Sequence, residues 1–196
     1  MPFNIPNILT LLRIALIPVF IGIYYVPDVS LSLHYKHVLG TFIFWLASIT
    51  DWLDGYAARK LNQHSAFGAF LDPVADKLMV AAALIMLVSF GQLNPIIAFI
   101  IIGREIAISA LREWMAKLGE SKSTAVSMLG KVKTTFQMLA ILFLLYHEKL
   151  FGVDTHLAGR WLIYIAALLT LWSMAYYLML AWPEMARNDA KNSGKN

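Results

Sequence analysis

Long apolar segments are the feature that most constrains the fold of this 196-residue chain. Hydrophobic residues make up 59% of it and charged residues only 14%, whereas an ordinary soluble domain is about 25% charged. A helix needs roughly 20 consecutive apolar residues to cross a bilayer. Six segments of this kind follow one another, at residues 5–25, 36–61, 68–90, 95–118, 128–146 and 157–182. We therefore predict an all-α integral membrane protein, a single domain with six transmembrane helices.

The distribution of basic residues indicates how these helices cross the membrane. One side collects only Lys36, Lys149 and Arg160, whereas the other side collects the remaining lysines and arginines. This asymmetry predicts that both termini and the loops after the second and fourth segments are cytoplasmic. No basic residue precedes the first apolar segment and no small-residue cleavage site follows it, so we expect no removable signal peptide. Residues 183–196 are expected to form a flexible cytoplasmic tail.

Net charge and cysteine content exclude several functional classes. The net charge of +4 reflects the local asymmetry and suits anionic headgroups and substrates rather than nucleic acid. The chain has no cysteine, which excludes disulfides, thiolate metal sites and cysteine nucleophiles.

Four aspartates stand where the second apolar segment ends and the third begins, in the stretch DWLDGYAARKLNQHSAFGAFLDPVAD. Asp51 and Asp54 are three residues apart, and Asp72 and Asp76 are four apart. On helices each pair therefore lies on one face, and the short loop folds the two faces together. We expect the four carboxylates to converge near the cytoplasmic surface of the membrane.

Such a group of carboxylates needs compensating cations, because like charges repel and each carboxylate loses hydration. Oxygen ligands favour hard ions, so we expect Mg²⁺, with Mn²⁺ or Ca²⁺ as substitutes. Four negative charges balance two divalent ions, an arrangement that clamps the attacking and leaving oxygens in phosphoryl transfer. The alternative is a set of helix caps and interfacial charges, but ionisable groups inside membrane helices are functional by default.

The residues between the aspartates fit a site for a bulky diphosphate. Gly55 and Gly68 remove side-chain bulk beside the acidic faces, and Arg59 supplies a forked cation. Each has an ordinary explanation, because glycines pack helices together in membranes and an arginine anchors a helix at the interface. Their combination with the aspartates indicates a diphosphate site.

The pattern D-x-x-D-G-x-x-A-R, eight residues, then G-x-x-x-D-x-x-x-D resembles the complete signature of the CDP-alcohol phosphotransferases. The resemblance implies a six-helix membrane bundle that forms homodimers. It implies that two metal ions are bound by Asp51, Asp54, Asp72 and Asp76. It also implies that Asp76 is the general base, and that Gly55, Arg59 and Gly68 contact the CDP moiety.

The stretches GREIAISALREWMAKLG and GKVKTTFQM look most like the phosphatidylglycerophosphate synthases of that family. The implied substrates are CDP-diacylglycerol and sn-glycerol 3-phosphate, with release of CMP, and the implied location is the bacterial cytoplasmic membrane. The residues support an anionic acceptor independently, since a second basic group lies on the cytoplasmic side beyond what CDP needs. Its members are Arg104, Arg112, Lys131 and Lys133. Which of them binds the acceptor phosphate stays open.

Two weaker signals lie near the aspartates. Asn7, Thr10 and Arg13 share one helical face and either reach the headgroup or nucleotide region or mark an interfacial helix start with a snorkelling arginine. His64 is a second candidate base, although its loop position favours a solvated histidine. The other histidines are expected on the outer side, away from the chemistry: His34, His37, His147 and His156.

Two other functions compete with this one. A sister transferase would act on another phosphorylated polyol. An ion-coupled transporter would also carry acidic residues inside its helices, but transporters place them near the midplane, often with paired repeats. Here the acidic residues cluster at one face and no repeat is visible.

Overall fold

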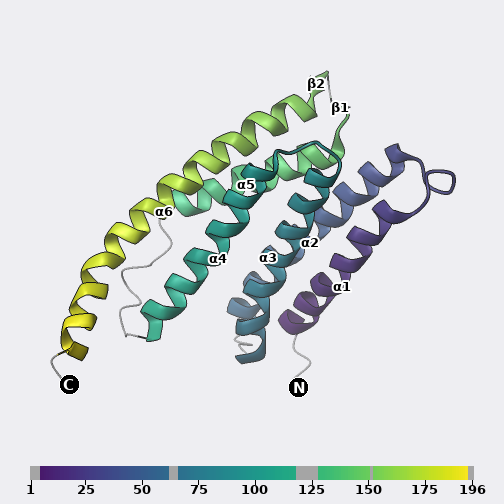
Figure 1. Cartoon of the computed structure of the whole chain (residues 1–196). Coiled ribbons are helices and arrows are strands. Elements are labelled where there is room, and N and C mark those ends of the chain that lie inside the picture. The colour runs from purple at the N-terminus through teal and green to yellow at the C-terminus, as the bar shows by residue number, and fades with distance from the viewer. Residues whose placement is uncertain (1–4, 62–65, 118–127, 151, 194–196) are drawn as a thin grey trace.

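Six α-helices make up almost all of the described chain (Figure 1). The computed structural model describes residues 5–61, 66–117, 128–150 and 152–193. The helices are α1 (Ile5–Tyr25), α2 (Leu33–Leu61), α3 (Ala66–Ser89), α4 (Pro95–Lys117), α5 (Met128–Tyr146) and α6 (Thr155–Ser193). A short antiparallel hairpin, β1 (Lys149–Leu150) with β2 (Val153–Asp154), joins α5 to α6.

The helices lie where the apolar segments predicted them. Helices α1 to α5 match the first five segments to within about three residues at each end, a usual uncertainty for helix boundaries. Helix α6 is longer than predicted, because it continues to Ser193 through most of the stretch expected to be a flexible tail. The extension includes several residues of high helix propensity, among them Glu184, Ala186 and Ala190. The flexibility of the tail stays a prediction.

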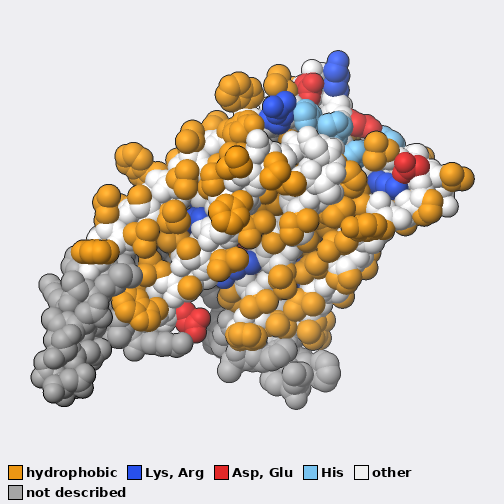
Figure 2. All heavy atoms as spheres, in the orientation of Figure 1, with side chains coloured by type: hydrophobic (Ala, Val, Ile, Leu, Met, Phe, Trp, Pro, Cys, Tyr) orange, Lys and Arg blue, Asp and Glu red, His pale blue; other side chains and the backbone are white. Residues whose placement is uncertain are grey.

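The outer surface of the bundle is strongly apolar. Figure 2 shows hydrophobic side chains over most of the visible flank, with charged and histidine side chains gathered at the upper end. Phe99 is 76% exposed and Trp172 is 72% exposed. Two described stretches, Asn7–Tyr25 and Thr155–Met179, are long and apolar enough to cross a membrane. An apolar exterior of this extent is typical of a protein that contacts lipid.

Two glycines allow neighbouring helices to approach closely. Helix α1 packs against α2, and α5 packs against α6. A Cβ atom added at Gly40 of α2 would collide with the ring of Tyr24 in α1. A Cβ atom added at Gly159 of α6 would lie only 3.0 Å from the backbone nitrogen of Leu144 in α5. In lipid no hydrophobic driving force brings helices together, so helix association depends on close van der Waals packing. Small residues at helix crossings allow that packing.

The bundle has two distinct ends. The start of α1 and the end of α6 lie at one end in Figure 1, where α2 also ends and α3 begins; we call this the aspartate end. The turn between α3 and α4 and the β-hairpin lie at the opposite end, which we call the hairpin end. Helix α3 stops there because Gly91 adopts φ 68° and the Gln92 nitrogen bonds back to the Leu87 oxygen at 2.9 Å, a common helix-terminating geometry.

Candidate active site

Polar residues of α1 contact aspartates of α2 and α3. Arg13 Nη1 lies 2.8 Å from Asp51 Oδ1, and the Thr10 hydroxyl donates a hydrogen bond to Asp72 Oδ1. Arg13 is 1% exposed and Thr10 is fully buried, whereas the Asp51 side chain is 43% exposed. The Arg13 guanidinium is therefore held inside the protein beside the aspartates, which excludes the snorkelling alternative. Asn7, on the same helical face, is also buried.

Asp76 lies about one turn beyond Asp72 on α3 and is half-buried. It is within electrostatic range of Asp51 in α2, Arg13 in α1 and Glu105 in α4. Asp76 is thus close to charged groups on three neighbouring helices, α1, α2 and α4. The structure thus brings Asp51 and Asp76 within electrostatic range of each other. The convergence of all four aspartates stays a prediction, because the Asp54 side chain lies outside the described residues.

Several predicted residues are placed only by their helices. For five of them the structure describes the helix but not the residue's own surroundings: Asp54, Gly55 and Arg59 in α2, Arg112 in α4 and Lys131 in α5. His64 lies wholly outside the described residues. Gly68 is buried near the start of α3.

The donor chemistry of the aspartates fits a hard divalent cation. Carboxylate oxygens are the ligands that Mg²⁺ and related ions prefer. Among the side chains that the structure describes, no three histidine, cysteine, aspartate or glutamate groups already close around a common point. Instead Arg13 puts a positive charge beside Asp51. The Arg13 guanidinium is thus one cation that already lies beside these carboxylates.

A second polar group, formed by Arg104, Glu105, Lys133 and Ser173, joins α4, α5 and α6. Lys133 Nζ lies 3.0 Å from Glu105 Oε1, and Arg104 Nη1 lies 3.2 Å from the same oxygen. Arg104 Nη2 donates to the Ser173 hydroxyl at 3.2 Å. Both cations are almost wholly buried, with exposures of 8% for Arg104 and 2% for Lys133. The structure thus brings two of the four predicted basic residues together.

Glu105 is a residue that the sequence reasoning missed. It directly follows Arg104 within an otherwise apolar segment, and an ionisable residue in such a segment is itself a functional signal. Arg104, Lys133 and Glu105 together carry one net positive charge. A buried group of this kind attracts an anion that arrives with several hydrogen-bond acceptors, such as a phosphate.

The histidines expected on the outer side gather at the hairpin end. The ring centroids of His37 and His147 lie 5.4 Å apart, and those of His147 and His156 lie 4.5 Å apart. His34 contacts Glu148. These four histidines are therefore at the end opposite to the aspartates, as predicted.

Comparison with known proteins identifies relatives over most of the chain. The model of the CDP-alcohol phosphatidyltransferase family matches residues 3–172. A Haemophilus influenzae protein named CDP-diacylglycerol–glycerol-3-phosphate 3-phosphatidyltransferase is 51% identical over 183 residues, which cover 92% of this chain and 95% of that protein. Proteins of the same name from Escherichia coli K12 and Salmonella typhimurium are each 48% identical over 185 residues, covering 92% of this chain and 96% of theirs. This chain belongs to the CDP-alcohol phosphatidyltransferase family.

Proposed function

We propose that this membrane enzyme transfers the phosphatidyl group of CDP-diacylglycerol to sn-glycerol 3-phosphate, giving phosphatidylglycerophosphate and CMP. The reaction belongs to anionic phospholipid synthesis. The observation that carries the proposal is that relatives named for this reaction are about half identical over nearly the whole chain. The whole chain would act as one domain.

Asp76 is the proposed general base. It would take the proton from the primary hydroxyl of the acceptor while the hydroxyl oxygen attacks the β-phosphorus of CDP-diacylglycerol. The bond from that phosphorus to the bridging oxygen then breaks, and CMP leaves with the electron pair. The half-buried position of Asp76, within electrostatic range of Asp51 in α2 and Glu105 in α4, supports this role.

The proposed metal ligands are the four signature aspartates Asp51, Asp54, Asp72 and Asp76. Two divalent ions, Mg²⁺ by donor chemistry, would supply electrostatic stabilisation of the diphosphate. The diphosphate and cytidine would contact Gly55, Arg59 and Gly68. Arg13 is added to this set, because its buried guanidinium already lies beside Asp51.

The proposed acceptor site is the basic group of α4 and α5. Arg104 and Lys133 would bind the phosphate of glycerol 3-phosphate, with Arg112 and Lys131 as further candidates. The support is geometric, since Glu105 contacts both Arg104 and Lys133 and is also within electrostatic range of Asp76. A phosphate held there would leave the other end of a three-carbon acceptor facing the base.

We further propose that all six helices cross the bacterial cytoplasmic membrane, with both termini and the aspartate end in the cytoplasm, and that the enzyme is a homodimer. The shared end of the first and last helices and the apolar flank support this topology. The basic residues favour the cytoplasmic orientation.

An acceptor screen tests the function. The purified chain in detergent is given labelled CDP-diacylglycerol and one acceptor at a time: glycerol 3-phosphate, glycerol, inositol, inositol phosphate or serine. We expect CMP release with glycerol 3-phosphate in Mg²⁺ and none after EDTA treatment, with activity restored by added Mg²⁺.

Three results would contradict the proposal. Equal transfer to glycerol would show that the acceptor phosphate is not recognised, and faster transfer to inositol phosphate would identify a sister transferase. Full activity in EDTA would remove the metal from the mechanism.

A further inference from the structure

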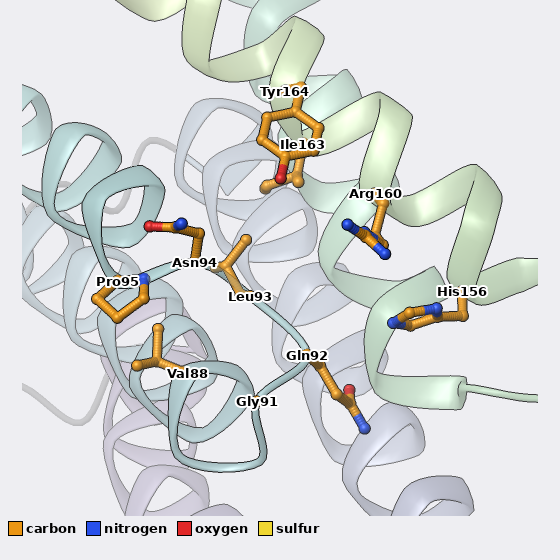
Figure 3. Close-up of a pocket in the computed structure, with 10 residues that line it drawn as sticks. All are labelled: Val88, Gly91, Gln92, Leu93, Asn94, Pro95, His156, Arg160, Ile163 and Tyr164. Atoms are coloured by element: carbon orange, nitrogen blue, oxygen red, sulfur yellow. The ribbon is translucent and has the colours of Figure 1, made fainter.

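A cavity of about 500 Å³ lies at the hairpin end, between α6 and the turn that joins α3 to α4. Figure 3 shows His156, Arg160 and Tyr164 extending from α6 toward the turn that carries Gln92 and Asn94. At about 1.5 Å per residue, α3 separates this cavity from Asp76 by roughly 20 Å. The cavity is therefore distinct from the proposed active site.

Two polar side chains of the cavity, Arg160 and Gln92, have hydrogen-bonding capacity that the described residues do not satisfy. Within the described part of the chain, no carboxylate forms an ion pair with Arg160, and its side chain is exposed. Gln92 Oε1 is buried without a hydrogen-bond donor among the described residues. A buried amide oxygen without a donor costs about 1–3 kcal/mol, so a ligand hydroxyl that donates to it, once the Gln92 side chain turns toward Arg160, stabilises the site. Asn94 Oδ1 already accepts a bond from the Ile96 nitrogen at 2.8 Å.

Apolar surface borders the same cation. Arg160 also lines a second hollow of about 280 Å³ together with Leu157, Trp161 and Tyr164. Leu157 is 55% exposed and Trp161 is 65% exposed. A cation with exposed tryptophan and tyrosine is the usual composition of a helix at the membrane–water interface. The ligand of the cavity should therefore combine an anionic, hydroxyl-bearing head with an apolar body.

We propose that this cavity binds the headgroup of an anionic, hydroxyl-bearing phospholipid at the bilayer surface opposite the active site. Arg160 contacts the lipid phosphate, Gln92 accepts a hydrogen bond from the headgroup hydroxyl, and the acyl chains lie along the exposed apolar surface beside Trp161. The inference rests on the proposed crossing of the bilayer and not on the identity of the reaction. A free phosphate would satisfy Arg160 but would leave Trp161 and Leu157 without a contact.

The test compares lipid binding by three forms of the full chain in detergent: wild type, Arg160→Gln and Lys149→Gln. Lys149 is the matched control, because it is an exposed cation of β1 at the same end and does not line the cavity. Native mass spectrometry measures binding of phosphatidylglycerol and of phosphatidylcholine with identical acyl chains. A separate titration adds inorganic phosphate as competitor.

We expect wild type and Lys149→Gln to prefer phosphatidylglycerol, and Arg160→Gln to lose about fivefold of that preference, as expected for one basic residue at a membrane surface. Phosphatidyl transfer should stay normal in all three forms, which shows that the variants are folded. Equal preferences in all three forms, or equal losses in both variants, would overturn the proposal. Displacement of the lipid by millimolar phosphate would overturn the choice of a lipid as the ligand.

Discussion

Replacing Lys133 with methionine separates two roles that the structure allows for this buried cation. Lys133 is 2% exposed, and its Nζ lies 3.0 Å from Glu105 Oε1. One role is to hold α5 against α4 through this ion pair, and the other is to bind the phosphate of the acceptor. Methionine keeps most of the side-chain volume and removes only the charge.

The expected magnitudes differ between the two roles. A hydrogen bond to a charged group contributes about 1.5–3 kcal/mol, so loss of a phosphate contact should raise the KM for glycerol 3-phosphate by roughly 10- to 150-fold. The free energy of unfolding should fall much less, by about 1 kcal/mol, because Glu105 keeps Arg104 as a partner and is itself 25% exposed. The KM for CDP-diacylglycerol should change little.

Steady-state kinetics with each substrate varied in turn, together with thermal unfolding, checks these values. Lys149→Met is the control for loss of a lysine away from the site. The double variant Lys133→Met/Glu105→Gln gives the decisive comparison, because it removes both charges of the pair. If the double variant recovers a normal KM for glycerol 3-phosphate, then Lys133 acts only through Glu105 and the assignment of the acceptor site is wrong. Equal weakening for both substrates would also contradict it.

Four other predictions test the rest of the site and the packing. Asp51→Asn should abolish turnover and reduce the Mg²⁺ response, and near-normal Mg²⁺-dependent activity would refute its role as a ligand. Arg13→Gln should weaken CDP-diacylglycerol binding more than acceptor binding; the reverse order in substrate titrations would refute the nucleotide assignment. Asp76→Asn should lower the single-turnover rate by about 10²- to 10⁴-fold and retain binding of CDP-diacylglycerol. An inactive His64→Ala enzyme together with an active Asp76→Asn enzyme would identify His64 as the base instead. Gly159→Val should destabilise the fold by about 1–3 kcal/mol, and an unchanged thermal unfolding midpoint would show that α5 and α6 separate at little cost.

The sequence predicted the helices well because spanning segments need long apolar runs, which are visible without knowledge of the packing. It also predicted that Asp72 and Asp76 share a face, since helical spacing alone determines this. It did not reveal that Glu105 contacts both Arg104 and Lys133, because α4 and α5 meet only after the bundle forms. The same reason applies to Arg13, whose partner Asp51 lies on another helix.

The two buried charge groups near the proposed active site, Arg13 with Asp51 and Arg104 and Lys133 with Glu105, are held by partners that the proposed reaction would exchange. Arg13 contacts Asp51, which is also a proposed metal ligand, so the guanidinium and a divalent ion compete for one carboxylate. If Asp51 served as a ligand, its contact with Arg13 would change, and the diphosphate of CDP-diacylglycerol would offer the buried Arg13 guanidinium a further anionic partner. Glu105 would have the corresponding role for Arg104 and Lys133, because it contacts both cations and a bound phosphate would share them. Because an uncompensated buried charge costs several kcal/mol, each group favours the ligand of opposite charge, and Asp76 lies within reach of both groups.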